Sequence, residues 1–324
     1  MKRYLNCPMI KHSLHFFYDE VRTCCSNVSG PVIYFDYSGE KIDWNEVFKF
    51  RNGIVGIINN DDLSEDVTYS QIGCKDCFEF EKYVQSEKIS PFENKINRIY
   101  FQNNMSCNAK CSYCTFQNVE RGYRYKLLPI VNSLIENDLL SENPYIFMSG
   151  GEMTIYPEFE ELLTIFSNYK KSFIELVTSG IKFSSAIQNA FVQNKLTMLL
   201  SLDSGTRETY QKIKKVDCFD DVVNNLKIYT DATDNAKNNI ILKFILVDCV
   251  NDNIQEINKF FDVVLSLGVK NVRLDVDFEK YHIATNHPVP KHYHQLFDYF
   301  NSFAQKNNLS VKSYGQTEEI LNYE

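Results

Sequence analysis

The stretch that decides the fold is residues 96–114, INRIYFQNNMSCNAKCSYC. Its first six residues are mostly apolar and β-prone, which predicts a short buried strand. A polar loop follows directly and carries Cys107, Cys111 and Cys114, spaced C-x3-C-x2-C. In a reduced compartment, cysteines this close together indicate a metal centre and not disulfides. The sequence therefore predicts a metal site just after a strand.

Downstream of residue 95, short apolar runs alternate with longer amphipathic ones. We expect strands at residues 95–102, 144–151, 173–180, 197–205, 239–248 and 270–278, and helices at 126–140, 158–170, 184–194, 207–215, 221–232, 253–268 and 292–308. Six strand-plus-helix units in series predict parallel strands with right-handed crossovers. The fold class is therefore α/β, either a doubly wound sheet or a curved partial barrel. In both folds ligands bind at the carboxyl ends of the strands, where the triplet lies.

The first 92 residues follow another pattern. Residues 13–25 predict a hairpin that turns near residues 18–20, and residues 43–50 predict a short helix. Five of the ten cysteines of the chain fall in this region: Cys7, Cys24, Cys25, Cys74 and Cys77. We therefore expect a small Cys-rich α+β module at 1–92, a core at 93–285, and a C-terminal helix and strand at 286–324 that pack on the core.

Composition excludes several classes of protein. The chain has 324 residues, 44% of them hydrophobic, so it can bury a large core. A net charge of −8 argues against a general nucleic-acid surface. No apolar run is long enough to span a bilayer, and the N-terminus lacks a clean apolar block with a cleavage site. We expect a cytoplasmic protein without membrane or nucleic-acid partners.

A triplet of cysteines leaves one coordination position open. A cubane cluster has four irons, so three thiolates leave one iron accessible to an outside ligand. A structural zinc ion is the alternative, and it would need a fourth ligand. His12 or His15 could supply that ligand.

Four features in chain order resemble the radical S-adenosylmethionine (SAM) superfamily. The triplet is the first, with Tyr113 directly before its last cysteine, and Ser149-Gly150-Gly151-Glu152 resembles the family's Gly-Gly-Glu motif. The third expected strand ends in Thr178 and Ser179. The fourth ends in Ser201-Leu202-Asp203-Ser204, where the family often has Ser-x-Asp-Gly. The resemblance covers residues from about 95 to about 275.

The resemblance implies a partial (β/α)6 barrel of the TIM type and a SAM-binding 4Fe–4S cluster on the triplet. Glu152 and nearby carbonyls would take the ammonium group of SAM. Thr178, Ser179, Ser201 and Asp203 would contact its ribose and carboxylate. It also implies reductive cleavage of SAM to a 5′-deoxyadenosyl radical, which takes a hydrogen atom from the substrate. A flavodoxin- or ferredoxin-type protein would donate the electron.

The upstream cysteines resemble the twitch or SPASM-type module of some radical SAM enzymes, through FYDEVRTCC (17–25), WNEVFKFRNGI (44–54) and GCKDC (73–77). Here the module would precede the barrel instead of following it, and Asp19 replaces the usual turn glycine. The resemblance implies an auxiliary 4Fe–4S cluster on Cys7, Cys24, Cys74 and Cys77, with Cys25 spare. Four sulfurs also suit a structural zinc ion, which stays an alternative.

Cys249 follows the fifth expected strand. A thiol there could return a hydrogen atom to a substrate radical, although a buried structural cysteine is the commoner case. We expect the enzyme to modify a ribosomally made peptide by epimerisation or cross-linking. Oxidation of a sugar or other small-molecule alcohol is the alternative. An alternative of another class is a non-catalytic zinc or iron–sulfur protein that senses redox state or acts as a scaffold.

Overall fold

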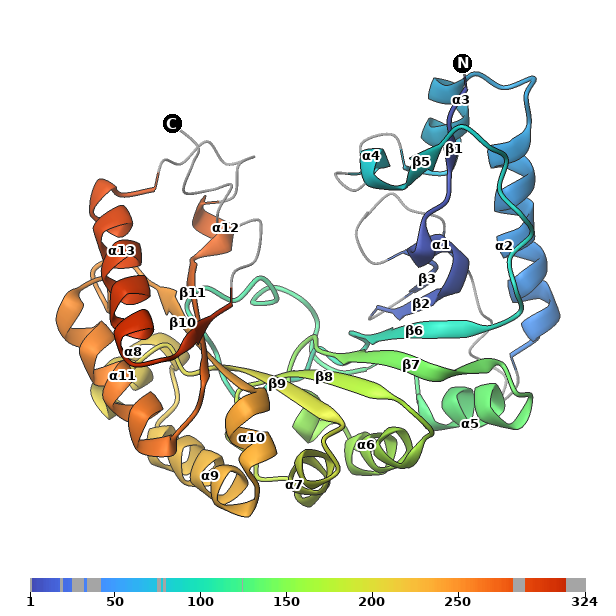
Figure 1. The fold of residues 1–324 in the computed structure, drawn as a ribbon. Helices are drawn as coiled ribbons and strands as arrows, with labels where there is room; N and C mark the ends of the chain where they lie inside the picture. Colours follow the sequence, from blue (N-terminus) through green and yellow to red (C-terminus); the bar gives the residue numbers. More distant parts are fainter. Residues whose placement is uncertain are drawn as a thin grey trace. The chain divides into compact units, whose positions relative to one another are not determined.

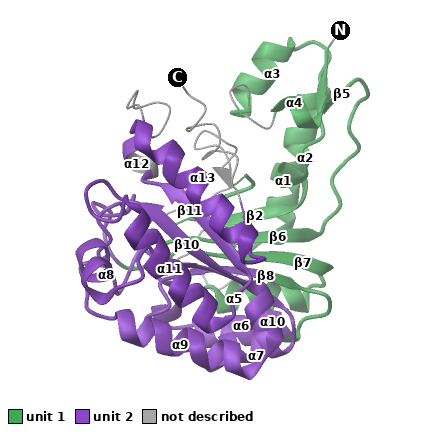
Figure 2. Cartoon of the chain, turned by 60° about the vertical axis from the view of Figure 1, so that its left-hand side comes forward, with its two compact units in different colours: residues 1–104, 122–150, 168–173 green, residues 105–121, 151–167, 174–324 purple. Residues whose placement is uncertain are grey.

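The computed structural model describes residues 2–17, 20–24, 32–33, 42–74, 77, 80–123, 125–281 and 289–312 (Figure 1). The expected hairpin turn at 18–19 and Cys25 lie outside these residues. The chain forms two compact units (Figure 2): unit 1 comprises residues 1–104, 122–150 and 168–173, and unit 2 comprises residues 105–121, 151–167 and 174–324. These limits differ from the expected boundaries at residues 92 and 285, so the three-part division stays a prediction.

Unit 1 contains a sheet with strand order β4-β3-β2-β6-β7. The strands are β4 (Val32–Ile33), β3 (Val21–Arg22), β2 (Ser13–Phe16), β6 (Ile96–Phe101) and β7 (Leu140–Met148). The β2–β3 and β3–β4 pairs are antiparallel, which confirms the hairpin, whereas β2–β6 and β6–β7 are parallel. The N-terminal hairpin thus continues the same sheet as the strand that leads to the triplet.

The helices of unit 1 are α1 (Pro8–His12), α2 (Trp44–Asn59), α3 (Glu65–Gln71), α4 (Phe80–Tyr83) and α5 (Leu128–Glu136); β1 (Tyr4–Leu5) and β5 (Val84–Gln85) form a separate antiparallel pair. Helix α2 begins at an N-cap, where the Asp43 carboxylate accepts from the backbone of Asn45 and Glu46. It is longer than expected because its buried side chains continue at helical spacing to Ile58. The buried guanidinium of Arg51 donates to the carbonyls of Ile10 and Ser13, tying α2 to α1.

Unit 2 is an α/β layer. Its strands are β8 (Phe173–Thr178), β9 (Leu196–Ser201), β10 (Ile240–Leu246), β11 (Asn271–Val276) and β12 (Ser310–Val311), and each pairs in parallel with the next. Its helices are α6 (Phe159–Asn168), α7 (Ser185–Val192), α8 (Arg207–Lys214), α9 (Phe219–Ala232), α10 (Asp234–Asn239), α11 (Ile254–Leu267), α12 (Phe278–Tyr281) and α13 (Lys291–Lys306), with a 3-10 turn, η1 (Met153–Ile155). The α/β class and its parallel strands are confirmed.

The core of unit 2 lies between these strands and the helices along one of their faces. Helices α7, α9, α10 and α11 lie together there (Figure 1). Phe244 of β10 packs edge-on against Phe260 of α11 with ring centroids 5.1 Å apart. Phe261 of α11 in turn contacts Phe300 of α13 at 4.7 Å. Because alternate strand residues face opposite sides, the residues between these core positions point away from the helices.

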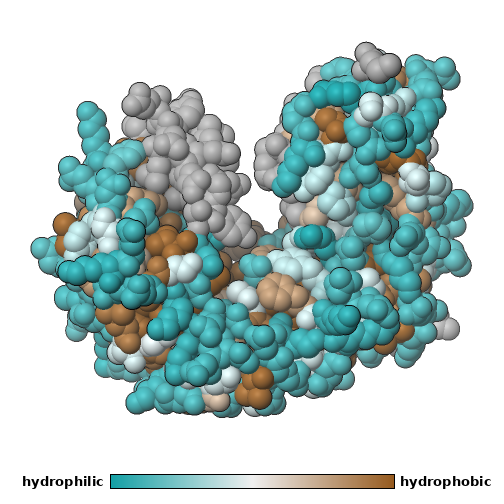
Figure 3. All heavy atoms as spheres, viewed as in Figure 1, coloured by the Kyte–Doolittle hydropathy of each residue, from teal (hydrophilic) through white to brown (hydrophobic). Residues whose placement is uncertain are grey.

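Polar side chains cover most of the face seen in Figure 3. Among the described residues, no helix is both long and apolar enough to cross a bilayer.

Candidate cofactor site

The loop that carries the triplet is attached to the end of a helix. The backbone N–H of Lys110 donates to the carbonyl of Lys214 at 2.9 Å, and the N–H of Ser112 donates to the carbonyl of Ile213 at 2.9 Å. Both carbonyls belong to the last turn of α8, whose C-terminal carbonyls have no partner within the helix. The two hydrogen bonds therefore fix the backbone of the loop on both sides of Cys111.

The three thiols lie close enough to influence one another electrostatically. Cys107, Cys111 and Cys114 are all half-buried and free of disulfides. Burial raises the pKa of Cys107 and of Cys114, and the neighbouring thiolates of the triplet add to each shift. The N–H of Ala109 donates to Cys107 Sγ at 3.4 Å. Three thiols presented by one ordered loop suit a polynuclear iron cluster, whose positive charge would stabilise the thiolates of Cys107 and Cys114 against the effect of burial.

The Gly-Gly-Glu turn has a steric reason for its second glycine. A Cβ on Gly151 would lie 2.3 Å from the carbonyl oxygen of Ser106 and 2.8 Å from the carbonyl carbon of Met105. That close approach allows the N–H of Glu152 to donate to the Ser106 carbonyl at 2.7 Å. The turn is therefore packed directly against the backbone that precedes Cys107. Gly150 has a φ of +111°, which only glycine adopts readily.

The carboxylate of Glu152 is buried and held by four neutral donors. One oxygen accepts from the N–H of Thr154 at 3.0 Å, from Thr154 Oγ1 at 2.7 Å and from Thr178 Oγ1 at 2.8 Å. The other accepts from the N–H of Ser179 at 2.6 Å. Ser179 Oγ also donates to Asn108 Oδ1 at 3.2 Å, which links this carboxylate to the triplet loop. The structure thus brings together the residues predicted from two separate motifs, with Thr178 and Ser179 orienting Glu152.

Asp203 lies in a buried network behind the triplet. Lys214 Nζ is 2.5 Å from Asp203 Oδ2 and 2.6 Å from the hydroxyl of Tyr113, which also donates to Asp203. Burial alone would lower the pKa of Lys214, but the Asp203 carboxylate and the Cys111 thiolate outweigh it and the pKa rises. Burial and the same two anions raise the pKa of Tyr113 well above its usual value. The network therefore keeps a buried cation beside Cys111.

Asp203 also organises the strand ends next to it. Its other oxygen accepts from the N–H of Ile245 at 2.9 Å, and its carbonyl accepts from Asn251 Nδ2 at 2.8 Å. Asp203 itself has a φ of +60°. Both carboxylate oxygens are thus engaged inside the protein. This placement suits Asp203 for holding the hydroxyl of Tyr113 in position. The predicted direct contact between Asp203 and SAM remains a prediction.

Sequence reasoning missed three residues of this site: Asn108, Lys214 and Asn251. Lys214 ends an amphipathic helix, where a lysine normally indicates the solvated end of the helix dipole. Asn251 lies in a polar turn, and its role depends on a contact with a residue 48 positions away. The sequence offered only weak indications that these residues belong to the site. Lys214 lies eleven positions after Asp203, and Asn108 lies inside the triplet.

Ser201 and Cys249 have looser surroundings. Ser201 ends β9 and is half-buried, and its hydroxyl has no hydrogen bond within the described part of the chain. Cys249 follows β10 in a turn, is exposed, and has a φ of +57°. Its role as a hydrogen-atom donor stays a prediction.

The four predicted auxiliary ligands lie together in unit 1. Cys24 and Cys74 are buried, and Cys7 and Cys77 are half-buried. Burial raises the pKa of Cys7 to about 11, with contributions from Cys24 and Cys77. The pKa of Cys74 also rises, through burial and then through the other three thiols. Thiolates are ligands of both iron–sulfur clusters and structural zinc, so the donor type alone does not separate the two.

Over the described ranges, no three His, Cys, Asp or Glu side chains are arranged to hold a single metal ion. A cubane distributes its thiolates over four irons, so it does not require the sulfurs to converge on one point.

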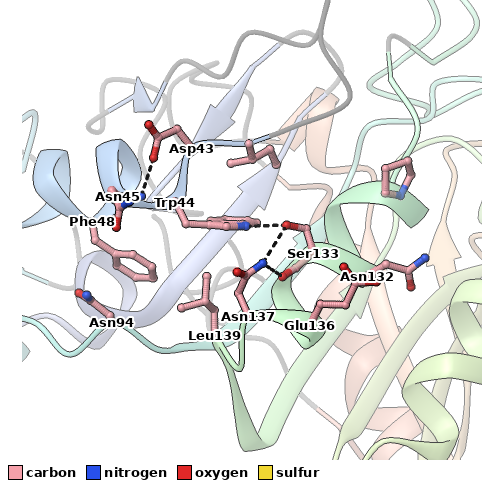
Figure 4. Close-up of a pocket in the computed structure, with 12 residues that line it drawn as sticks. Asp43, Trp44, Asn45, Phe48, Asn94, Asn132, Ser133, Glu136, Asn137 and Leu139 are labelled. Carbon is pink, nitrogen blue, oxygen red and sulfur yellow. Dashed lines mark hydrogen bonds between the residues drawn. The ribbon is translucent and has the colours of Figure 1, made fainter.

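A separate cavity of about 860 Å³ lies within unit 1, beside the start of α2 and along α5 (Figure 4). Trp44 Nε1 donates to Ser133 Oγ at 2.9 Å, and Asn137 Nδ2 donates to the Ser133 carbonyl at 2.8 Å. No predicted ligand or SAM-contacting residue lines it.

Comparisons with known proteins agree with this geometry. The family described as the Radical SAM superfamily matches residues 105–258. A probable GTP 3′,8-cyclase of Saccharolobus islandicus (strain Y.N.15.51) is 24% identical over 172 residues, 52% of this chain and 53% of the relative. This chain thus spans about half the length of the curated relatives it matches.

Two solved structures of Streptococcus suis SuiB share the fold. SuiB bound to S-adenosylmethionine has a TM-score of 0.53 and 15% identity, covering 68% of this chain and 51% of SuiB. SuiB bound to precursor peptide SuiA has a TM-score of 0.52 and 14% identity, covering 68% and 49%.

Proposed function

From the premise that this chain is a radical SAM enzyme with a radical SAM domain over residues 105–258, we propose that it cleaves SAM reductively to act on a peptide. When bound, the cluster and SAM together supply a 5′-deoxyadenosyl radical that takes a hydrogen atom from the substrate. The observation that carries this proposal is the convergence of the triplet loop, the Gly151 turn and the Glu152 carboxylate within unit 2.

The residues of the chain have distinct tasks in this proposal. Cys107, Cys111 and Cys114 hold the cluster. Gly151 lets the backbone approach closely, and Glu152, oriented by Thr178 and Ser179, accepts the ammonium group of SAM. Burial of these groups strengthens each polar contact and excludes water from a reactive intermediate.

Peptide modification, by epimerisation or cross-linking, is the substrate class we propose first. The fold is similar to that of SuiB, one structure of which contains a precursor peptide. Oxidation of a sugar or other small-molecule alcohol is the second candidate, because the same radical chemistry applies to it. A flavodoxin- or ferredoxin-type donor would supply the electron, and Cys249, exposed after β10, would return a hydrogen atom if the reaction is an epimerisation.

We propose further that Cys7, Cys24, Cys74 and Cys77 hold an auxiliary 4Fe–4S cluster. The mutual influence of the four thiols on their pKa values supports this assignment. Structural zinc on the same sulfurs is the alternative.

The triplet is tested by anaerobic reconstitution with iron and sulfide, followed by reduction in the presence of SAM. We expect 5′-deoxyadenosine, measured by liquid chromatography, and we expect Cys111→Ala to abolish it because one iron loses its ligand. Cys218→Ala is the matched control, since Cys218 lies at the start of α9 outside the site. If Cys111→Ala still forms the product, the assignment of the triplet is wrong. If the wild type forms no product and holds zinc at the loop, the proposal is wrong and the non-catalytic sensor or scaffold is favoured.

The auxiliary cluster is tested by counting irons with Mössbauer spectroscopy. Two cubanes predict about eight irons per chain, and Cys77→Ala should lower this to about four while basal SAM cleavage persists. About four irons in the wild type, with zinc in unit 1, would overturn the second cluster and leave the first intact.

A further inference from the structure

One row of side chains on unit 2 is not explained by the cofactor site. The register places Ser201 of β9 opposite Lys243 of β10, and Lys243 opposite Arg273 of β11. Leu242 and Phe244, on either side of Lys243, are fully buried on the helix-covered face. Lys243 therefore points to the opposite face, as do Ser201 and Arg273.

The charges around Lys243 do not balance. Among the described residues, the charged groups with the largest effect on it are Asp203, Asp275, Arg273 and Lys214. Asp203 is paired with Lys214 at 2.5 Å, and Asp275 is paired with Arg273 at 2.7 Å. Each carboxylate thus already has its own cation, and Lys243 is the third cation beside two carboxylates.

The ammonium group of Lys243 makes no hydrogen bond and no ion pair with any described residue, although the backbone carbonyl of Lys243 accepts from Leu202 and Asp203. Loss of hydration lowers its pKa, and the two carboxylates offset this only in part. A half-buried ammonium group without a counter-ion is costly, and proteins keep such groups mainly where a ligand supplies the missing charge.

We propose that Lys243, with the hydroxyl of Ser201 beside it, binds a carboxylate or phosphate group of the substrate, which reassigns Ser201 from SAM to the substrate. This inference rests on the proposed function and adds the requirement that the substrate is anionic near the reacting carbon. An ammonium group offers up to three donors to such an anion, and Ser201 adds one more.

Geometry favours the substrate over SAM as the source of the anion. Glu152 is oriented by the end of β8, whereas Lys243 lies two strands away on β10, about 10 Å across the sheet at the usual strand spacing. The ammonium and carboxylate of the SAM methionine share one carbon atom. A carboxylate placed beside Glu152 would therefore lie away from Lys243.

The test uses the reconstituted protein loaded with SAM and titrates inorganic phosphate and, separately, acetate by isothermal calorimetry against a chloride blank of equal ionic strength. The variants are Lys243→Met, Lys243→Arg and, as a matched control, Lys270→Met at an exposed lysine. We expect Lys243→Met to weaken anion binding at least about tenfold, since a charge-assisted hydrogen bond contributes about 1.5–3 kcal/mol. Lys243→Arg and Lys270→Met should bind like the wild type.

Two further readouts distinguish the alternatives. The dissociation constant of SAM and the yield of 5′-deoxyadenosine without substrate should stay unchanged in Lys243→Met. If SAM affinity falls instead and phosphate competes with SAM, the anion is the carboxylate of SAM and the substrate assignment is wrong. The substrate assignment is also wrong if the wild type binds neither phosphate nor acetate more strongly than the chloride blank. Failure of SAM cleavage in the wild type would contradict the proposed function while leaving the anion titration interpretable.

Thermal unfolding separates binding from a structural role. Removing an unpaired, poorly hydrated charge should leave the unfolding temperature of Lys243→Met equal to or above that of the wild type. A marked fall would show that Lys243 supports the fold, and would overturn the proposal.

Discussion

At the scale of single residues, the Asp203–Lys214 pair shows how a buried ion pair depends on both partners. Helix α8 begins at Arg207, which is exposed, and ends at Lys214, which is almost fully buried. Lys214 pairs with a buried carboxylate, whereas Arg207 pairs with exposed Asp217 at 2.6 Å. The two cations on one helix therefore form a matched comparison of a buried and an exposed pair.

We predict that Lys214→Met lowers the free energy of unfolding by about 3–5 kcal/mol, because Asp203 would be left buried and charged. The double variant Lys214→Met/Asp203→Asn should recover much of this loss. Arg207→Ala should lower the free energy of unfolding far less than Lys214→Met does, because exposed ion pairs contribute little. Urea denaturation followed by circular dichroism measures all three. A loss for Lys214→Met as small as that for Arg207→Ala would contradict the buried pair.

His15 on β2 predicts a pH dependence of stability. Its ring is stacked on Phe17 with centroids 3.8 Å apart, and Nε2 lies 2.6 Å from Gln102 Oε1. Burial lowers the pKa of His15 from 6.5 to about 4. Between these values the unfolded chain binds a proton that the folded chain does not, so stability falls as the pH drops from 6.5 toward 4.

Between pH 7 and pH 5, His15 should lower the free energy of unfolding by on the order of 2 kcal/mol or less. The variant His15→Gln should lose that part of the pH dependence, and His294→Gln, at an exposed position, should retain it. Urea midpoints at the two pH values provide the measurement. Equal pH slopes for wild type and His15→Gln would show that His15 titrates normally.

At the scale of elements, the Gly-Gly-Glu turn and the triplet loop depend on each other through Gly151. We predict that Gly151→Ala displaces the backbone at Met105 and Ser106, because the added Cβ would meet backbone atoms at 2.3 and 2.8 Å. Such overpacking typically costs about 1–3 kcal/mol, and iron retained after reconstitution should fall with it.

Gly56→Ala is the control for that variant, since a Cβ at this position of α2 meets nothing within 4 Å. In a helix interior this change should stabilise the protein by up to about 1 kcal/mol. Iron content measured by colorimetry should therefore be lower in Gly151→Ala than in Gly56→Ala. Equal iron retention in both would rule out steric control by Gly151.

The elements also show what the sequence could predict. Every strand expected after residue 95 is present, because each is a short apolar run of the right period. Helix α10 was missed, since Asp234–Asn239 has no apolar stripe and is held by a Thr233 N-cap and by packing. The parallel pairing of β2 with β6 was also missed, because it joins residues about 85 positions apart and no local pattern encodes such a contact.

At the scale of the whole molecule, each unit is assembled from separate stretches of the chain. Residues 105–121, with the triplet, and residues 151–167, with Glu152, both belong to unit 2, although the strands before them belong to unit 1. Motif order could predict that these stretches serve one site. It could not predict which buried partners support them, because Lys214, Asn251 and Asn108 are defined by three-dimensional contacts.

The attachment of the triplet loop to the end of α8 has a consequence for how iron would be acquired. Lys110 and Ser112 are already anchored to the helix, so the loss of chain entropy accompanies folding and not metal uptake. Domains that fold around their metal do so because no site exists beforehand. The hydrogen bonds from Lys110 and Ser112 to α8 would therefore reduce the chain entropy that binding a cubane has to overcome.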